Sequence, residues 1–437
     1  MRICFLSRRY WPAVSGMSVY AENLLAQLRA RGHDVALVSQ YRGDAAGRAV
    51  YGGGPPPADR VPEGVRVVAL ESLGEQRVGQ GLPADFEADI AAMREAVLRL
   101  HAQEPFDVVH AQYAWPTGMA GLLAAAELGP PCVVSVQGGD GHWVGLCCPE
   151  HSAGIRTVLD RADAVLIGSE TFAQEVGEHH GTDPARFTLI GGATDTRAFS
   201  PGPGDELTGL LDRDGDGVTT LLFHGRVDRR KGVLDLLRAL AVLRAEGRPV
   251  RLLVSGIGPD MDAAAELVGE LGLGGAVEQS GYTAYAEAPG VYRRGDVFVS
   301  PTQSEGFSNT ILEAMAAGLP VVTTRTVGVV DCVRDGRNGL LHEVGDVDAL
   351  VAALRRLLDD PDLARELAGN ALAEVRERWS WPALTARIEA VYDRVGGAPG
   401  DTSWTALPAG ERPTSRGRGV EPDGERACPY LAAPHLL

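Results

Sequence analysis

The stretch GRVDRRKG, residues 225–232, contains the only lysine in a chain of 437 residues. Arg226 and Lys231 follow a short apolar run, Gly225 and Gly232 flank the two cations, and an amphipathic segment begins at Gly232. Cations, glycines that permit tight turns and the start of a helix, all placed after a strand, favour binding of a pyrophosphate. The structural alternative is a solvated run of charges that opens a helix.

A second polar stretch, PTQSEGFSNTILEAMAAGLPVV over residues 301–322, carries two glutamates eight residues apart. Glu305 follows the apolar run 297–300, and Glu313 lies in a helix that we expect over 308–317. Carboxylates accept hydrogen bonds from neighbouring hydroxyl groups, and a helix N-terminus attracts phosphate. The stretch therefore suits a sugar that is joined to a diphosphate.

The start of the same helix offers further polar groups. Ser308, Asn309 and Thr310 add hydroxyl and amide donors for such a ligand. An alternative remains open for Glu313, because Thr310-x-x-Glu313 also has the form of a capping box. For Glu305 the alternative is a solvated loop charge.

Short apolar runs alternate with amphipathic segments along most of the chain. Runs that are apolar throughout indicate parallel strands buried on both faces, so we predict α/β folds of the doubly wound type. The predicted strands are 3–7, 35–39, 65–70, 108–111, 133–136, 165–167, 187–190, 220–223, 250–255, 277–280, 297–300 and 321–324. The predicted helices are 17–31, 84–103, 232–247, 260–272, 308–317, 346–358, 361–377 and 382–395.

Changes in composition suggest the domain borders. We expect an N-terminal domain over 1–200, a Gly- and Pro-rich linker over 201–218 and a second domain over 219–378. A helix within 379–395 is expected to cross back to the first domain, and a disordered tail is expected over 396–437. Two facing α/β domains imply a cleft, because ligands bind beyond the carboxyl ends of the strands. The loop at Gly16, after the first strand, is expected to face this cleft.

The composition disfavours several classes of partner. The net charge of -17 and the pI of about 5.1 disfavour nucleic acid and anionic membrane surfaces, and are compatible with a neutral or cationic partner. No segment approaches the length of a membrane span, and the first apolar run is too short for a signal peptide. We therefore expect a cytoplasmic protein whose six cysteines stay reduced.

Two possible metal sites fail on their spacing. The run 212–217 copies the opening of a calcium loop, but the twelfth position, which requires a glutamate, is Phe223. His142, Cys147, Cys148 and His151 match no standard zinc spacing. We expect no metal site.

The ordered motifs together resemble the retaining glycosyltransferases of family 4, which have the GT-B fold of two facing Rossmann-like domains. The resemblance extends from Arg2 to about Arg394, and Glu305-x7-Glu313 matches the E-x7-E motif of that family. The motifs that carry it are RGHDVALVS, PFDVVHAQ, ADAVLIGSE, ATDTRAF, HGRVDRRKG, GDVFVSPTQSEGFSNTILEAMAAGLPVV and NGLLHEVGD.

The resemblance implies a role for each matching residue. Arg226 and Lys231 would neutralise a departing diphosphate. Glu305 would contact hydroxyl groups of the transferred sugar, and Glu313 the ribose of the nucleotide.

The resemblance also implies the rest of the donor site. Backbone groups at Gly306 and Phe307, together with Asn309 and Thr310, would line the sugar–phosphate pocket. The loop at Gly16 would approach the diphosphate. No metal or other cofactor is expected, and the co-substrate would be a sugar of the UDP or GDP type.

Two positions depart from the family pattern. The first loop has Ser15 before Gly16, where relatives often have two glycines, and Gln137 stands where relatives usually have a histidine. A glutamine can donate a hydrogen bond to a sugar but cannot carry a positive charge. Asp140 either binds the acceptor or caps a turn, and His142 either replaces the missing histidine or is an ordinary loop residue.

The leading hypothesis is a retaining transfer of a hexose or N-acetylhexosamine unit to a small soluble acceptor, as in natural-product biosynthesis. A lipid-linked or cell-envelope acceptor is the main alternative. The sequence also leaves open an epimerase or hydrolase on the same fold, a dinucleotide oxidoreductase and a non-catalytic sensor. The sequence does not support the oxidoreductase hypothesis, because no G-x-G-x-x-G motif follows the first predicted strand.

Overall fold

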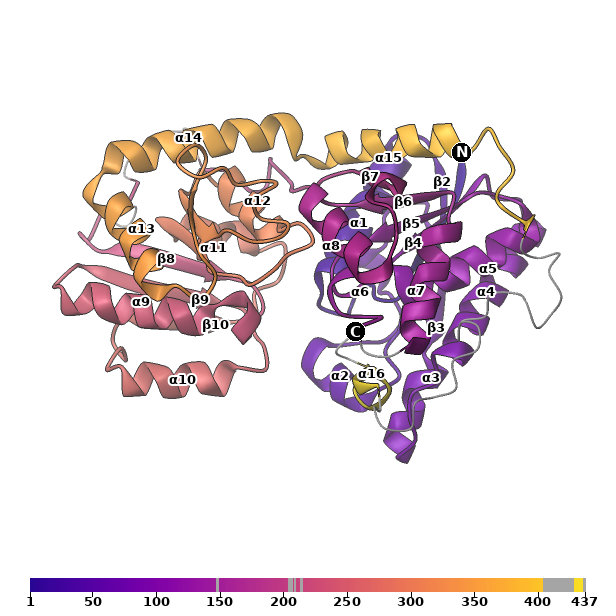
Figure 1. The fold of residues 1–437 in the computed structure, drawn as a ribbon, viewed down its shortest axis with the longest axis horizontal. Helices are drawn as coiled ribbons and strands as arrows, with labels where there is room; N and C mark the ends of the chain where they lie inside the picture. Colours follow the sequence, from indigo (N-terminus) through magenta and orange to yellow (C-terminus); the bar gives the residue numbers. More distant parts are fainter. Residues whose placement is uncertain (147–148, 203–206, 208–209, 213–214, 404–427, 435–437) are drawn as a thin grey trace. The chain divides into compact units, whose positions relative to one another are not determined.

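The computed structural model describes residues 1–146, 149–202, 207, 210–212, 215–403 and 428–434. The chain forms two compact units, shown in Figure 1. Unit 1 consists of Met1–Ile190 and Thr385–Leu437, and unit 2 consists of Gly191–Leu384. Helix α15 (Trp381–Val395) begins in unit 2 and continues in unit 1.

Unit 1 is built on a parallel sheet of seven strands in the order β3-β2-β1-β4-β5-β6-β7. Four consecutive residues of β1, from Ile3 to Leu6, are fully buried, so both faces of the sheet are covered. The strands are β1 (Arg2–Ser7), β2 (Asp34–Tyr41), β3 (Arg66–Glu71), β4 (Val108–Gln112), β5 (Cys132–Val136), β6 (Ala164–Ile167) and β7 (Phe187–Leu189).

Helices connect these strands, and part of α15 completes the unit. Its Tyr392 hydroxyl lies 2.5 Å from Nδ1 of the buried His110 on β4. The helices are α1 (Gly16–Ala30), α2 (Ala45–Tyr51), α3 (Leu73–Gln76), α4 (Phe86–Gln103), α5 (Met119–Leu128), α6 (Gly139–His142), α7 (Pro149–Arg161), α8 (Glu170–His180) and α16 (Pro429–Ala432). Short turns of other helical types are η1 (Ala58–Arg60), η2 (Arg77–Gln80), η3 (Ala114–Gly118) and η4 (Pro184–Arg186).

Unit 2 has a parallel sheet of six strands in the order β10-β9-β8-β11-β12-β13. Alternate residues of β8 face opposite sides, since Leu221 and Phe223 join one apolar cluster and Leu222 joins another. The strands are β8 (Thr219–His224), β9 (Val250–Ser255), β10 (Val277–Gly281), β11 (Val297–Ser300), β12 (Val321–Thr324) and β13 (Leu340–His342).

The two apolar clusters lie under different helices of unit 2. Residues of α9 and α13 join the first cluster, and residues of α11 and α12 join the second. The prediction of two doubly wound α/β folds is confirmed. The helices are η5 (Arg229–Lys231), α9 (Val233–Ala245), α10 (Met261–Glu270), α11 (Ala288–Arg293), α12 (Asn309–Ala316), α13 (Val347–Asp359) and α14 (Pro361–Arg378).

Three segments differ from the predictions. Strand β13 was not expected, because three residues are too short to give a recognisable pattern. Leu210 and Leu211 of the predicted linker are buried in the core of unit 2. Residues 428–434 of the expected disordered tail contain a helical turn, because buried Cys428 and Tyr430 give this segment an apolar side that can pack on unit 1.

No helix in the described ranges has the length and apolar character needed to cross a membrane.

Candidate active site

Asp228 organises the turn that follows β8, which opens at Gly225 with a φ of 145°. The Asp228 carboxylate accepts hydrogen bonds from the backbone N–H of Lys231 at 2.9 Å and from Nε of Arg226 at 2.7 Å. Burial opposes ionisation of Asp228, but the Arg226 guanidinium holds the pKa of the carboxyl below its usual value. An ionised Asp228 therefore holds both predicted cations on one turn.

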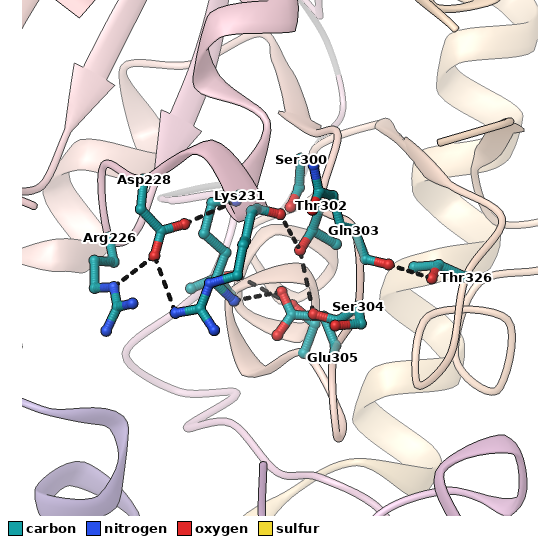
Figure 2. A network of polar contacts seen from close by, with 12 residues as sticks. Arg226, Asp228, Lys231, Ser300, Thr302, Gln303, Ser304, Glu305 and Thr326 are labelled. Atoms are coloured by element: carbon teal, nitrogen blue, oxygen red, sulfur yellow. Dashed lines mark hydrogen bonds and ion pairs between the residues drawn. The ribbon is translucent and has the colours of Figure 1, made fainter. Parts of the chain in front are cut away.

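Lys231 reaches the loop that follows the neighbouring strand, as Figure 2 shows. Its Nζ lies 2.6 Å from Oε1 of Glu305. The two residues meet because β8 and β11 are adjacent and parallel, which places their carboxyl ends at one edge of the sheet. The Lys231 and Glu305 side chains are 33% and 12% exposed, so a ligand can reach both.

Hydrogen bonds to backbone carbonyls hold the Glu305 loop in place. The carbonyl of Arg230 accepts from the N–H of Gln303 at 2.7 Å, and the Thr326 hydroxyl donates to the carbonyl of Gln303 at 2.5 Å. The Glu305 N–H donates to the carbonyl of Val327 at 3.1 Å. The loop is thus fixed on both sides, which orients the carboxylate of Glu305 (Figure 2).

Two glycines allow the backbone segments to approach this closely. A Cβ atom at Gly232 would lie 2.0 Å from the carbonyl oxygen of Pro301, and one at Gly328 would lie 2.0 Å from that of Glu305. Both glycines also have positive φ values, of 77° and 74°. No other residue type meets both demands without moving the loop.

The predicted hydroxyl and amide donors gather at the start of α12. Ser308 is the N-cap, Asn309 is the first helical residue, and the hydroxyl oxygens of Ser308 and Thr310 lie 3.2 Å apart. Gly306 and Phe307 lead from Glu305 into this helix, and the Phe307 ring packs 5.1 Å from that of Trp379. The glutamate and the helix start therefore belong to one continuous loop.

Glu313 points to a tyrosine rather than to the helix start. Its Oε2 accepts a hydrogen bond from the Tyr292 hydroxyl at 2.7 Å. A capping box would require Thr310 as the N-cap, but the N-cap is Ser308, so the capping-box alternative is wrong. Burial raises the pKa of Glu313 to about 7, although the hydrogen bond from Tyr292 opposes the rise.

Gly16 lies in unit 1, at the first position of α1. The preceding Ser15 caps the helix, because its hydroxyl accepts a hydrogen bond from the N–H of Ser18 at 3.2 Å. A Cβ atom at Gly16 would meet no atom within 4 Å. Packing within the protein therefore does not demand a glycine here, whereas close approach of a ligand would.

Gln137 and Asp140 hold the loops that follow β4 and β5. The Gln137 side-chain oxygen accepts from Nε2 of Gln112 at 2.8 Å. The Asp140 carboxylate accepts backbone N–H groups of Ala114, Gln137 and Gly138 at 2.8, 3.1 and 2.9 Å. Burial raises the pKa of Asp140 to about 6, and its hydrogen bonds give it the turn-capping arrangement that the sequence left open.

His142 lies in a buried aromatic environment. Its Nδ1 is 2.8 Å from Oε1 of Glu175, and its ring centroid is 4.4 Å from that of Phe172. Cys147 and Cys148, which the zinc alternative required, lie outside the described residues. Within the described ranges, no group of three or more His, Cys, Asp and Glu side chains could hold a metal ion.

Sequence reasoning missed two residues that support the site. Asp228 lies inside the GRVDRRKG stretch, and its position three residues before Lys231 is the usual signal for a side chain that caps a helical turn. Tyr292 gave no such signal, because it is 21 residues from Glu313 and lies on a different helix.

Both units match known sequence families. Residues 15–193 match a family described as glycosyl transferase 4-like domain, and residues 218–360 match glycosyl transferases group 1. D-inositol 3-phosphate glycosyltransferase from Gordonia bronchialis is 30% identical, with 87% of this chain and 84% of the relative covered. Glycogen synthase from Mycobacterium tuberculosis is 29% identical, and the match covers 90% of this chain and 94% of the relative.

Solved structures share the fold. Sucrose-phosphate synthase from Thermosynechococcus elongatus superposes with a TM-score of 0.71 at 23% identity, covering 91% of this chain and 99% of its own. Anabaena HepE, solved in complex with UDP and glucose, has a TM-score of 0.68 at 20% identity and covers 90% and 100%. These matches confirm the GT-B fold and the family that the motifs indicated. The chain is a glycosyltransferase and belongs to family 4.

Proposed function

We propose that this glycosyltransferase moves a hexose or N-acetylhexosamine unit from a nucleotide-diphosphate sugar to a small soluble acceptor, with retention of configuration. One observation carries the proposal: Lys231 Nζ lies 2.6 Å from Glu305 Oε1 at the carboxyl edge of the unit 2 sheet. A cation suited to a diphosphate thus lies next to a carboxylate suited to sugar hydroxyl groups.

In the proposed reaction, the bond between the anomeric carbon and the β-phosphate oxygen breaks. The acceptor hydroxyl attacks the same face and forms a new bond to that carbon, and its proton passes to the departing diphosphate. Lys231 and Arg226 stabilise the negative charge that develops on the diphosphate oxygen. Glu305 positions the sugar through its hydroxyl groups.

The relatives support the choice of substrates. Anabaena HepE has been solved with UDP-glucose, which favours a donor of the UDP type, with GDP sugars as the alternative. The D-inositol 3-phosphate glycosyltransferases are named for a small polar acceptor. We propose an acceptor of similar size, bound by unit 1.

We also propose that transfer needs no metal ion. In many enzymes a divalent cation neutralises a leaving diphosphate. Here a lysine and an arginine on one turn, both oriented by Asp228, offer two positive charges for the same purpose.

The proposal is tested by incubating the protein with UDP, GDP, ADP and dTDP sugars and a panel of small polyols and sugars. We expect one nucleotide class to give a glycosylated product, and nucleotide release to depend on the acceptor. The anomeric configuration of the product, determined by NMR, reports on retention. Nucleotide release that proceeds equally without acceptor would favour a hydrolase instead, and an inverted product would refute retention.

A further inference from the structure

Three arginines lie together in the interior of unit 1. Arg8 and Arg9 directly follow β1, and Arg42 directly follows the adjacent strand β2. Their exposed fractions are only 1%, 1% and 3%. Arginine is rarely buried to this extent unless its charge is paired, so the partners of this arginine cluster decide what it does.

Glu75 is the carboxylate bonded directly to the cluster, and it is itself fully buried. It accepts a hydrogen bond from Nη2 of Arg8 at 2.6 Å and a short one from Nη2 of Arg9. Its other oxygen accepts the backbone N–H of Gly43 at 3.0 Å. A single carboxylate therefore serves two guanidinium groups.

Two further acids nearby accept hydrogen bonds from groups outside the cluster. Asp89 accepts from the Ser72 hydroxyl at 2.6 Å and from the Gly74 N–H at 3.1 Å, and burial raises its pKa to about 6. Asp44 caps α2 by accepting the N–H of Gly47 at 2.7 Å. Burial lowers the pKa of Arg42 to about 9, and the charge of Arg9 adds to this effect, whereas the charges of Glu75 and Asp44 oppose it.

Several donors of the cluster are unused. Nε and Nη1 of Arg8, Nε of Arg9, and Nε and Nη1 of Arg42 have no hydrogen-bond partner among the described residues. The side-chain amide of Gln40, near the end of β2, also has no hydrogen-bond partner among the described residues. Buried unpaired donors are costly, and an anion with several oxygens is the chemical group that would satisfy a set of guanidinium donors.

The arginine cluster is connected to the predicted acceptor pocket. The Ser7 hydroxyl donates to the carbonyl of Arg9 at 2.6 Å and lies 2.8 Å from Oε1 of Gln112. Nε2 of Gln112 in turn donates to Oε1 of Gln137 at 2.8 Å. The cluster and Gln137 thus share the carboxyl edge of the sheet, where open α/β folds bind their ligands.

The C-terminal segment 428–434, which contains α16 (Figure 1), contacts the cluster at Arg8. The carbonyl of Pro434 accepts a hydrogen bond from Nη2 of Arg8 at 3.3 Å, and that of Leu431 accepts from the N–H of Ala84 at 2.8 Å. A neutral carbonyl is a weaker partner for a guanidinium than a charged oxygen. A bound anion would therefore compete well with this segment.

We propose that Arg8, Arg9 and Arg42 bind an anionic group of the acceptor, a phosphate or a carboxylate, which replaces the Pro434 carbonyl at Arg8. This inference rests on the proposed function and narrows its acceptor to anionic molecules. The net charge of -17 suggested a neutral or cationic partner, but a buried local cluster acts on its ligand more strongly than the distant, screened surface charge.

The test measures binding without turnover. Inorganic phosphate, glucose 6-phosphate, glucuronate and neutral glucose are titrated by calorimetry into the full-length protein and two variants. Arg42→Gln should weaken binding of glucose 6-phosphate and glucuronate roughly 10- to 100-fold. Neutral glucose should bind to the wild type more weakly than either of these anions. Arg238→Ala, the second variant, removes only an exposed ion pair on α9 and should leave this binding unchanged. Comparing the affinity for glucose 6-phosphate with the affinity for glucuronate shows whether the cluster prefers a phosphate or a carboxylate.

A thermal shift with UDP reports on folding and on the donor site in the same variants. Equal affinity of the wild type and Arg42→Gln for the anions, with UDP binding intact, would overturn the inference and leave a structural role for the cluster. Productive transfer only to neutral acceptors would also overturn it. If Arg42→Gln loses anion binding but the wild type binds no nucleotide sugar, the inference about the cluster stands and only the proposed function is refuted.

Discussion

Nζ of Lys231 lies 2.6 Å from Oε1 of Glu305, although the two residues are 74 positions apart in the chain. The lysine assigned to the diphosphate and the carboxylate assigned to the sugar are therefore paired with each other before a donor binds. A diphosphate would draw Lys231 away from this pair and leave Glu305 free to accept sugar hydroxyl groups. Under the proposed function, the ion pair would therefore couple recognition of the diphosphate to recognition of the sugar.

Lys231→Ala should lower kcat by about 100- to 1,000-fold, because the developing charge on the leaving group loses a preorganised cation. Stability should change little, since partly exposed ion pairs contribute at most about 1 kcal/mol. Initial rates at saturating donor and a thermal melt measure the two effects. Arg238→Ala, which removes an exposed ion pair on α9, is the control and should retain activity. Wild-type kcat in Lys231→Ala would contradict the assignment.

Glu305→Gln should separate sugar recognition from nucleotide recognition. The amide keeps the shape of the side chain but loses its charge, so Lys231 is released and sugar hydroxyl groups lose their best acceptor. We expect the affinity for UDP alone to be unchanged or higher, while kcat/KM for the UDP sugar falls by at least about tenfold. Calorimetry with UDP and initial rates with the sugar donor give the comparison. If the affinity for UDP and the kcat/KM for the UDP sugar fell together, Glu305 would serve only to hold the loop.

Glu313 should make stability depend on pH between about 4.5 and 7. In the folded protein its pKa is about 7, against 4.5 for the free carboxyl, so the folded state keeps a proton that the unfolded chain releases. The stabilising contribution is complete below about 4.5 and is lost as the pH rises toward 7, by roughly 3 kcal/mol. Urea unfolding between pH 4.5 and 8 should show a flatter profile for Glu313→Gln, whereas Glu266→Gln, an exposed change on α10, should follow the wild type.

The same ionisation should tighten nucleotide binding. A charged Glu313 accepts ribose hydroxyl groups better than a protonated one, so the UDP affinity of the wild type should rise from pH 6 to pH 8. The rise should be smaller in Glu313→Gln. An identical pH dependence in both proteins would remove Glu313 from the nucleotide site.

Activity should persist after treatment with EDTA, because Lys231 and Arg226 provide the charge that a metal would otherwise supply. Initial rates before and after chelation, followed by addition of Mg²⁺ or Mn²⁺, test this expectation. Loss of activity that is restored by either ion would refute it.

Gly328→Ala should damage both the fold and the site, because the new Cβ would lie 2.0 Å from the carbonyl oxygen of Glu305. Gly345→Ala is a matched control, since Gly345 has a φ of 75° but no atom within 4 Å of its Cβ position. The control should lose only the 1–2 kcal/mol, roughly, that positive φ costs. Gly328→Ala should lose more and should also lower kcat. Equal effects in the two variants would show that the close approach is unimportant.

The regular elements were predictable where the chain buries them. Strands β9, β11 and β12 begin and end where the apolar runs predicted, because strands buried on both faces must be apolar throughout. The three-residue strand β13 was missed, since its pairing with β12 supplies what its own sequence lacks. Residues 428–434 were also misjudged, because their order comes from packing on unit 1.

By itself, the sequence determined the doubly wound fold class, the family and the residue types of the candidate donor site, because these depend on local composition and spacing. The contacts between distant residues were decided only by the tertiary structure. Lys231 meets Glu305 because β8 and β11 are neighbours, and Arg8, Arg9 and Arg42 gather around Glu75 because β1 and β2 are neighbours. Strand order is set by the packing of the whole sheet, and no local pattern in the chain encodes which charged side chains that packing will bring together.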